Sequence, residues 1–180
     1  MNIKIADLEF EPLLSYEAIQ TRTKQIAKQL SKDYENKTPI FVGVLNGCFL
    51  FMADLVKNIT IPCEVAFTKL SSYHGGVSTT RRIRDDLDLT VDIENRHIVL
   101  VEDIVDTGNT LDYLVAKLKK RKPASITVCA MLVKPAAQEY EIKELKHIGF
   151  EIENEFVVGY GLDYMELGRN IKGVYKRVVS

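Results

Sequence analysis

The sequence predicts an α/β fold: a mostly parallel sheet flanked by helices, with a small hood lobe built from the two ends of the chain. Three observations indicate this fold. Short apolar runs of strand length recur at residues 40–45, 97–101 and 125–133. Segments with helical spacing of apolar residues separate these runs, and polar turns follow them directly. Such alternation is typical of a parallel sheet, whose functional residues gather at the carboxyl ends of the strands.

The length and composition agree with a single globular domain covering residues 1–180. Hydrophobic residues make up 46% of the chain and charged residues 27%, which allows a buried core. We expect the core to span about residues 15–158, since this part shows the alternation. The flanking segments, about residues 1–14 and 159–180, fit it poorly and are assigned to the hood.

Charge and cysteine content argue against several classes of protein. The 24 Lys and Arg residues balance 25 Asp and Glu residues, for a formal net charge of −1. This balance predicts no nucleic-acid partner and no membrane partner. The three cysteines show no metal-binding spacing, and no apolar run is long enough for a signal peptide or a membrane span. We therefore expect a reduced, cytoplasmic protein.

The amino-terminal part begins with a predicted helix at residues 15–31, capped by Ser15. Its apolar positions are Tyr16, Ile19, Ile26, Ala27 and Leu30. A buried strand at residues 40–45 then ends in Asn46–Gly47, and an apolar helix follows at residues 48–56. Pro62 opens another strand, at about residues 63–70.

A long polar stretch follows, from residue 71 to residue 96. It contains Gly75–Gly76 and the charged cluster at residues 81–86. A connection of this length predicts either a functional lid or a pair of edge strands with a mobile tip.

The carboxyl-terminal part continues the alternation. After the strand at residues 97–101, a helix is predicted whose apolar face comprises Leu111, Leu114, Val115 and Leu118. Basic residues crowd its end, where positive charge favours the helix dipole, and Pro123 stops it. A fourth strand covers residues 125–133, and a fifth begins at residues 156–158.

The most informative stretch joins the strand at residues 97–101 to the following helix. Two adjacent carboxylates, Glu102 and Asp103, come directly after the apolar strand. Neighbouring carboxylates repel each other and lose hydration, and a substrate hydroxyl pair or a bound metal would relieve both effects. The next turn, residues 106–110, lies where helix amides converge and could bind a phosphate. The alternative is that Asp106 or Thr107 simply caps the helix while the acids lie in solvent.

Residues 99–110 resemble the phosphoribosyl-pyrophosphate loop of type I phosphoribosyltransferases. The resemblance implies that Glu102 and Asp103 bind the ribose hydroxyls of that substrate and help to place magnesium. It also implies that the turn wraps the 5′-phosphate. The turn residues are Asp106, Thr107, Gly108, Asn109 and Thr110.

Further segments, in order and across about residues 40–170, resemble the hypoxanthine-guanine branch of this family. Leu45-Asn46-Gly47 resembles its pyrophosphate-binding loop, which commonly carries a non-proline cis peptide bond and often has lysine where this chain has Asn46. Ser72-Tyr73 resembles the head of its mobile lid. Lys134 matches a lysine that donates to the exocyclic oxygen of the purine.

The last matching segment runs from residue 156 to residue 169. By the same resemblance, Phe156 stacks on the purine and the Val157 backbone reads its edge. Asp163 corresponds to a carboxylate associated with magnesium, and Arg169 to a contact with pyrophosphate. Outside the resemblance, an apolar triplet at residues 156–158 alone would indicate only a core strand.

The resemblance implies a magnesium-dependent transfer of phosphoribosyl from phosphoribosyl pyrophosphate to hypoxanthine or guanine, with Asp106 as the general base at N7. It also implies a homodimer or homotetramer. Two alternatives stay open: preference for xanthine, and an RNA-binding regulator that retains the fold. The regulator would need a basic face, but Arg81, Arg82 and Arg84 are offset by two neighbouring aspartates.

Overall fold

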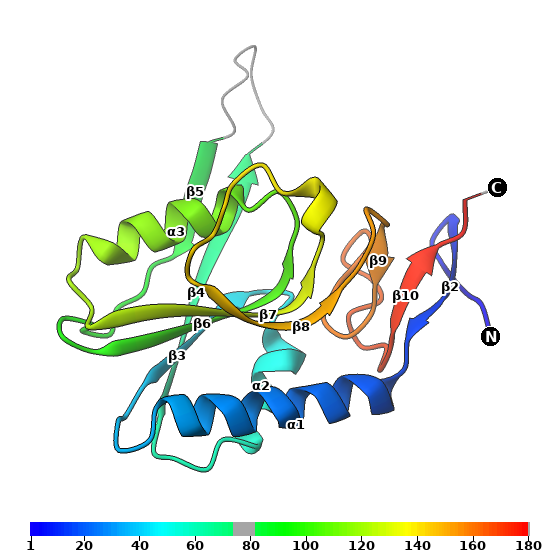
Figure 1. The fold of residues 1–180 in the computed structure, drawn as a ribbon. Coiled ribbons are helices and arrows are strands. Elements are labelled where there is room, and N and C mark those ends of the chain that lie inside the picture. Colours follow the sequence, from blue (N-terminus) through cyan, green and yellow to red (C-terminus); the bar gives the residue numbers. More distant parts are fainter. Residues whose placement is uncertain (74–81, 180) are drawn as a thin grey trace.

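The computed structural model describes residues 1–73 and 82–179, with backbone only for Ser72, Tyr73 and Arg82. Within these ranges the chain forms two sheets, which Figure 1 shows side by side. The six-stranded main sheet has the order β5-β4-β3-β6-β7-β8, and the four-stranded small sheet has the order β1-β2-β10-β9. The predicted α/β fold with a mostly parallel sheet and a small additional lobe is confirmed.

The main sheet is parallel except for one edge strand. Its strands are β3 (Ile40–Leu45), β4 (Glu64–Tyr73), β5 (Arg82–Leu87), β6 (His97–Val105), β7 (Ser125–Val133) and β8 (Leu145–Glu151). The edge strand β5 runs antiparallel to β4, so that part of the long polar stretch is an edge strand, as one of the two alternatives predicted. The strand β8 was not predicted from the sequence, because its side chains are mostly half-buried and its apolar pattern is correspondingly weak.

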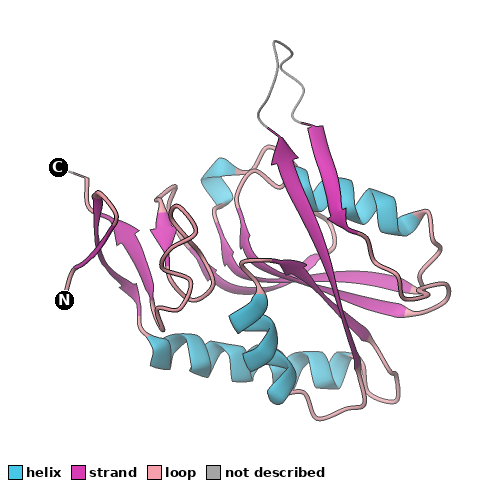
Figure 2. Ribbon diagram, turned by 180° about the vertical axis from the view of Figure 1, so that it is seen from behind, coloured by secondary structure: helices cyan, strands magenta, loops and turns pink. Residues whose placement is uncertain are grey.

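Helices cover both faces of the main sheet, as the opposite views in Figures 1 and 2 show. On one face, α1 (Tyr16–Asp33) and α2 (Phe49–Lys57) pack on inward side chains such as Phe41. On the other, α3 (Asn109–Lys119) packs on alternate residues such as Val42. Because both faces are covered, the central strands are almost continuously apolar, and this pattern allowed them to be predicted from the sequence.

The predicted helix positions agree closely with the structure. The Ser15 hydroxyl caps α1 by accepting a hydrogen bond of 3.2 Å from the Ala18 amide. All four predicted positions on the apolar face of α3 are buried. Tyr16 is an exception, because it is 37% exposed in the first turn of α1, where the Lys172 ammonium lies 6.0 Å from its ring centre. No helix in the described ranges has the length and apolar character needed to cross a membrane.

The small sheet brings the two ends of the chain together. Its strands are β1 (Ile3–Ile5), β2 (Leu8–Leu14), β9 (Val157–Val158) and β10 (Val174–Arg177), around a core of Ile5, Phe10 and Val158. The predicted fifth strand therefore exists as β9, but it pairs with β10 and not with the main sheet. Three of these strands are four residues or shorter, so their apolar pattern was too brief to detect.

Candidate active site

Two carboxylates lie inside β6, and not beyond its end as the sequence analysis expected. The strand continues to Val105 because β7 runs beside it that far, pairing Glu102 with Ala130 and Val105 with Val133. Glu102 is consequently buried, with 8% exposure, and Asp103 is half-buried. The pair thus stands at the carboxyl edge of the main sheet, in an environment where negative charge is poorly solvated.

The protonation of this pair reflects that environment. Burial, and next the charge of Asp103, raise the pKa of Glu102 well above its ordinary value. Burial also raises the pKa of Asp103 to about 6, although the Ile104 amide donates to its Oδ1 at 2.9 Å and Arg169 contributes favourable charge. Among the described residues, no group hydrogen-bonds to Oε2 of Glu102. A ligand that brings hydroxyl donors or positive charge would satisfy both side chains.

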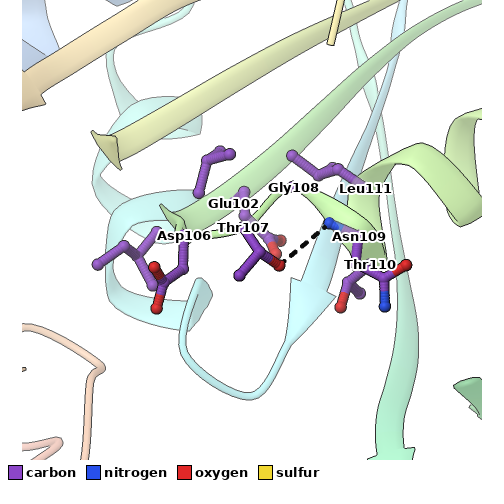
Figure 3. A pocket seen from close by; sticks show the side chains of 9 residues that line it. Glu102, Asp106, Thr107, Gly108, Asn109, Thr110 and Leu111 are labelled. Carbon is purple, nitrogen blue, oxygen red and sulfur yellow. Dashed lines mark hydrogen bonds between the residues drawn. The ribbon is translucent and has the colours of Figure 1, made fainter. Parts of the chain in front are cut away.

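A pocket of about 90 Å³ lies where β6 leads into α3 (Figure 3). Its wall consists of Glu102 and residues 104–111. The N-cap of α3 is Gly108, whose φ of +85° is accessible mainly to glycine. Gly108 occupies the N-cap position, but the Thr107 hydroxyl accepts a hydrogen bond from the Asn109 amide at 3.4 Å (Figure 3), so Thr107 does meet one amide at the start of α3, as the alternative interpretation allowed. The first amides of a helix lack carbonyl partners within it, so this turn is suited to an anion.

Neighbouring segments hold the pocket turn from behind. The Thr107 carbonyl accepts hydrogen bonds from the amides of Glu139 and Tyr140, at 2.9 and 3.2 Å. Lys134, at the end of β7, is buried, and its ammonium lies 3.3 Å from Oδ2 of Asp106. Its own amide donates to the Val105 carbonyl at 2.9 Å. The turn is therefore fixed to the carboxyl end of β7, and Asp106 is the exposed acid facing a buried cation.

The turn after β3 lies directly against the buried carboxylates. Its Leu45–Asn46 peptide bond is cis, as the resemblance implied, and the Asn46 side chain is exposed. A Cβ atom added to Gly47 would lie 1.5 Å from Oδ2 of Asp103, so the contact requires glycine. On the other side, a Cβ atom added to Gly161 would lie 1.9 Å from the Gly47 carbonyl oxygen. The Gly47 backbone is thus enclosed between β6 and the segment that follows β9.

The segment after β9 contributes an ion pair and an aromatic group. Arg169 pairs with Asp163 at 2.7 Å and donates to the Gly161 carbonyl at 2.9 Å. Phe156 is 44% exposed, and the Tyr164 ring lies edge-on to it at 5.7 Å between ring centres. Gly161 was not among the predicted residues, although two glycines flanking Tyr160 were a visible signal for a special backbone conformation.

Comparison with known proteins gives the family. A phosphoribosyl transferase domain model matches residues 12–165. The chain belongs to the phosphoribosyl transferase family. A hypoxanthine-guanine phosphoribosyltransferase of Streptococcus pneumoniae is 46% identical over 169 residues, covering 93% of each chain. A hypoxanthine phosphoribosyltransferase of Haemophilus influenzae is 41% identical over 171 residues, covering 93% of this chain and 95% of the relative.

Solved structures agree with these relatives. A Staphylococcus aureus hypoxanthine phosphoribosyltransferase superimposes with a TM-score of 0.88 at 40% identity, covering 93% of this chain and 91% of the other. A Bacillus anthracis hypoxanthine-guanine phosphoribosyltransferase gives a TM-score of 0.87 at 32% identity, covering 96% and 100%. The predicted membership of a phosphoribosyltransferase enzyme family, and the resemblance to its hypoxanthine-guanine branch, are confirmed.

The structure brings some of the predicted site residues of this phosphoribosyltransferase together around the pocket, but not all of them. The turn at residues 106–110, Glu102 and Lys134 with Asp106 form one group around the pocket. Asp163 pairs with Arg169, and the described residues contain no cluster of three or more side chains arranged as a metal site. The Ser72 and Tyr73 side chains lie outside the described part of the chain.

The unsatisfied oxygen of Glu102 and the neighbouring Asp103 nevertheless fit a hard cation. Magnesium prefers oxygen ligands and commonly keeps waters or substrate phosphates in its shell, so that one or two protein carboxylates suffice. The side chains present are therefore chemically suited to magnesium that arrives with an anionic substrate.

Proposed function

We propose that this enzyme transfers the 5-phosphoribosyl group of phosphoribosyl pyrophosphate to N9 of hypoxanthine or guanine, giving IMP or GMP and pyrophosphate. The observation that supports this most directly is a pair of adjacent carboxylates near the end of β6, before the turn to α3: the buried Glu102, which lines the pocket, and the half-buried Asp103. A sugar phosphate would meet both features at once, with its hydroxyls on Glu102 and Asp103 and its phosphate in the turn at residues 106–110.

The pyrophosphate would lie on the other side of the carboxylates. Backbone groups of Leu45, Asn46 and Gly47 would contact it, together with the guanidinium of Arg169. Asn46 is neutral where related enzymes often have lysine, so backbone donors and Arg169 would provide most of the stabilisation for the departing negative charge. Positive charge develops on the ribose at the same time, and orientation of the two substrates supplies a large part of the rate.

The purine would be held by three groups. Phe156 is exposed enough to stack on a flat ring, and the Val157 backbone would read its edge. The Lys134 ammonium would donate to the 6-oxo group, which adenine lacks. Asp106, at 3.3 Å from that ammonium, would accept the proton at N7 as general base. Ser72 and Tyr73 would shield the reacting centre from water.

Magnesium would be held by one or two of the carboxylates of Glu102, Asp103 and Asp163 together with substrate oxygens, since these three side chains do not form a ready-made cluster. When bound, it supplies charge that stabilises the leaving pyrophosphate. The protein's own contribution is to orient the ribose hydroxyls and to exclude bulk water from the buried end of β6. We further propose a cytoplasmic location and a homodimer or homotetramer, with small molecules as substrates and neither nucleic acid nor membrane as partner.

The RNA-binding alternative is less favoured by the charges near β5. Arg84 pairs with Asp86 at 2.6 Å, and Lys117 at the end of α3 pairs with both Asp85 and Asp88 at 2.8 Å. Cations that are already paired contribute less to phosphate binding. Preference for xanthine is the second alternative, because backbone groups read the 2-position of the purine.

The decisive experiment measures pyrophosphate release by the purified protein with phosphoribosyl pyrophosphate and magnesium. Hypoxanthine, guanine, xanthine, adenine and uracil are offered separately, each with and without a chelator. We expect turnover with hypoxanthine and guanine that is lost on chelation. Turnover chiefly with xanthine would favour the second alternative, and no turnover with any base, together with salt-dependent RNA binding, would favour the regulator.

A further inference from the structure

A buried acid outside the reaction pocket joins its own helix to two other segments of the chain. Asp54 of α2 is only 9% exposed. Its carboxylate accepts hydrogen bonds from Gln20 of α1 at 2.5 Å and from the Tyr160 hydroxyl at 2.8 Å, and it pairs with Lys57 at 2.6 Å. Burial acts to raise the pKa of Asp54, but the hydrogen bonds from Lys57, Tyr160 and Gln20 outweigh it and hold the pKa below its ordinary value. The carboxylate is therefore an ionised acceptor at neutral pH.

Tyr160 holds an uncommon backbone conformation. It is 3% exposed and has a φ of +49°, between Gly159 at +94° and Gly161 at +100°. A left-handed conformation is unfavourable for tyrosine, so surrounding contacts must maintain it. Hydrogen bonds do so: the Tyr160 amide donates to the Ile171 carbonyl at 2.7 Å, its hydroxyl donates to Asp54, and Thr23 also hydrogen-bonds to that hydroxyl.

These contacts form a closed path of bonded residues, here called the ring, around the turn that follows β3; it comprises Gly47, Asp54, Tyr160 and Gly161. The helix α2, which bears Asp54, begins at Phe49, two residues after Gly47, and the Phe49 amide donates to the Asn46 carbonyl at 3.3 Å. Gly161, next to Tyr160, lies so close to the Gly47 carbonyl that a Cβ atom there would approach to 1.9 Å. The path therefore runs from the turn along α2 to Asp54, across to Tyr160, and back to the turn through Gly161.

The same ring fixes Arg169. Its guanidinium donates to the Gly161 carbonyl at 2.9 Å, and the Gly161 amide donates to the Arg169 carbonyl at 3.0 Å. Gly161 is thus bonded through both of its backbone groups to the residue that contacts pyrophosphate in the proposed function. Of the proposed purine contacts, Lys134 lies at the end of β7, whereas Phe156 and Val157 precede Gly159 on the same segment as Tyr160. None of these three side chains takes part in the hydrogen bonds of the ring.

We propose that Asp54 and Tyr160 are positioning residues that set the geometry of the pyrophosphate subsite without touching the substrate. The proposal rests on the function proposed above. Loosening the hydrogen bond between Tyr160 and Asp54 changes the placement of Gly47 and Arg169. Binding of phosphoribosyl pyrophosphate is therefore weakened, while binding of the purine stays nearly unchanged.

The test uses Tyr160→Phe, which removes one hydroxyl from the Tyr160–Asp54 contact. We expect the KM for phosphoribosyl pyrophosphate to rise about tenfold, as for loss of one hydrogen bond to a charged group, while the KM for hypoxanthine stays within about twofold. Tyr34→Phe is the matched control. Tyr34 is also buried, belongs to the same core cluster, and donates to Thr127 near the start of β7 at 2.9 Å. It should lower Tm and leave both KM values unchanged.

A graded pair of variants tests the acceptor. Asp54→Asn keeps an oxygen for the Tyr160 hydroxyl and should raise the KM for phosphoribosyl pyrophosphate less than Asp54→Ala does. Equal increases in both KM values, or a lower Tm with an unchanged KM for phosphoribosyl pyrophosphate, would overturn the proposal, because either result describes a purely structural role.

Hydrogen exchange of the Gly161 amide separates this inference from the proposed function, since it needs no substrate. Exchange should be faster in Tyr160→Phe and unchanged in Tyr34→Phe, because only the first variant loosens the ring. If the wild-type protein bound no phosphoribosyl pyrophosphate, the proposed function would fail while faster exchange still supported the ring. Unchanged exchange in Tyr160→Phe would overturn the inference whatever the activity.

Discussion

Two acidic regions on one continuous segment differ sharply in their surroundings. The buried Glu102 and the half-buried Asp103 lie inside β6, between neighbouring strands, and both have pKa values raised chiefly by burial. Only three residues further along, the Asp106 side chain is 52% exposed and faces the Lys134 ammonium at 3.3 Å. The end of a buried strand can therefore place two kinds of carboxylate within one site. The carboxylates inside the strand would be stabilised by a ligand that supplies hydrogen-bond donors or cations. The exposed carboxylate is accessible to a substrate from which it could accept a proton.

The largest expected effect comes from the exposed region. Asp106→Asn should lower kcat with hypoxanthine by about 10²–10⁴, because it removes the proposed base. Its Tm should fall modestly, because the buried Lys134 ammonium loses its paired charge but keeps an oxygen acceptor. Steady-state kinetics and a thermal melt check both parts. A kcat within about threefold of wild type would show that Asp106 is not the general base.

The carboxylates inside β6 should make the free energy of unfolding depend on pH. The pKa of Asp103 is about 6 when folded against an ordinary value of 3.8, so the folded state binds the proton more tightly. Its contribution to stability is therefore greatest below about pH 4 and is lost as pH rises to about 6, by about 3 kcal/mol. Glu102 adds a decline of the same sign at higher pH.

Urea denaturation between pH 4 and pH 7 measures this decline. Asp103→Asn should flatten the curve over that range, because an amide does not ionise. Parallel curves for wild type and Asp103→Asn would show that the buried carboxyl is not the source of the pH dependence.

A substitution at the border of the buried region tests how closely it is packed. Gly47→Ala would place a Cβ atom 1.5 Å from Asp103, so the turn or the carboxylate must move. We expect kcat/KM to fall about 100-fold, as for a displacement of about 1 Å in a site. Gly149→Ala is the control, because it causes a similar steric clash outside the site: its Cβ would lie 2.3 Å from the Met131 carbonyl oxygen. It should lower Tm while kcat/KM stays near that of wild type.

The smallest effect is expected at Lys134, whose ammonium faces the Asp106 carboxylate. Lys134→Met keeps the buried aliphatic stem and removes the donor, so the KM for hypoxanthine should rise about tenfold. Discrimination against adenine should decrease, because the donor that favours a 6-oxo group is gone. Competition assays with the two bases measure this. Unchanged discrimination would mean that other groups read the 6-position.

The sequence predicted those parts of the fold that depend on local patterns. Continuous apolar runs indicated β3 and β7 with their observed bounds, because strands covered by helices on both sides must be apolar on both faces. Spacing of apolar residues indicated α1 and α3, and Ser15 indicated the start of α1. The turn at residues 106–110 was recognisable because a strand, a polar turn and a helix follow one another directly in the chain.

Contacts between distant segments were decided only by the tertiary structure. The burial of Glu102 depends on β7 continuing beside it, and β9 joins the small sheet because β10 lies there to pair with it. Asp54 and Tyr160 are 106 residues apart, and nothing in either local sequence indicates their hydrogen bond. Local patterns report which side chains a segment buries, but the partner of a buried polar group is set by how whole elements pack. The sequence by itself therefore determined the central strands, the helices and the turn at residues 106–110, whereas packing decided the charge environment of the carboxylates and the ring that holds Gly47.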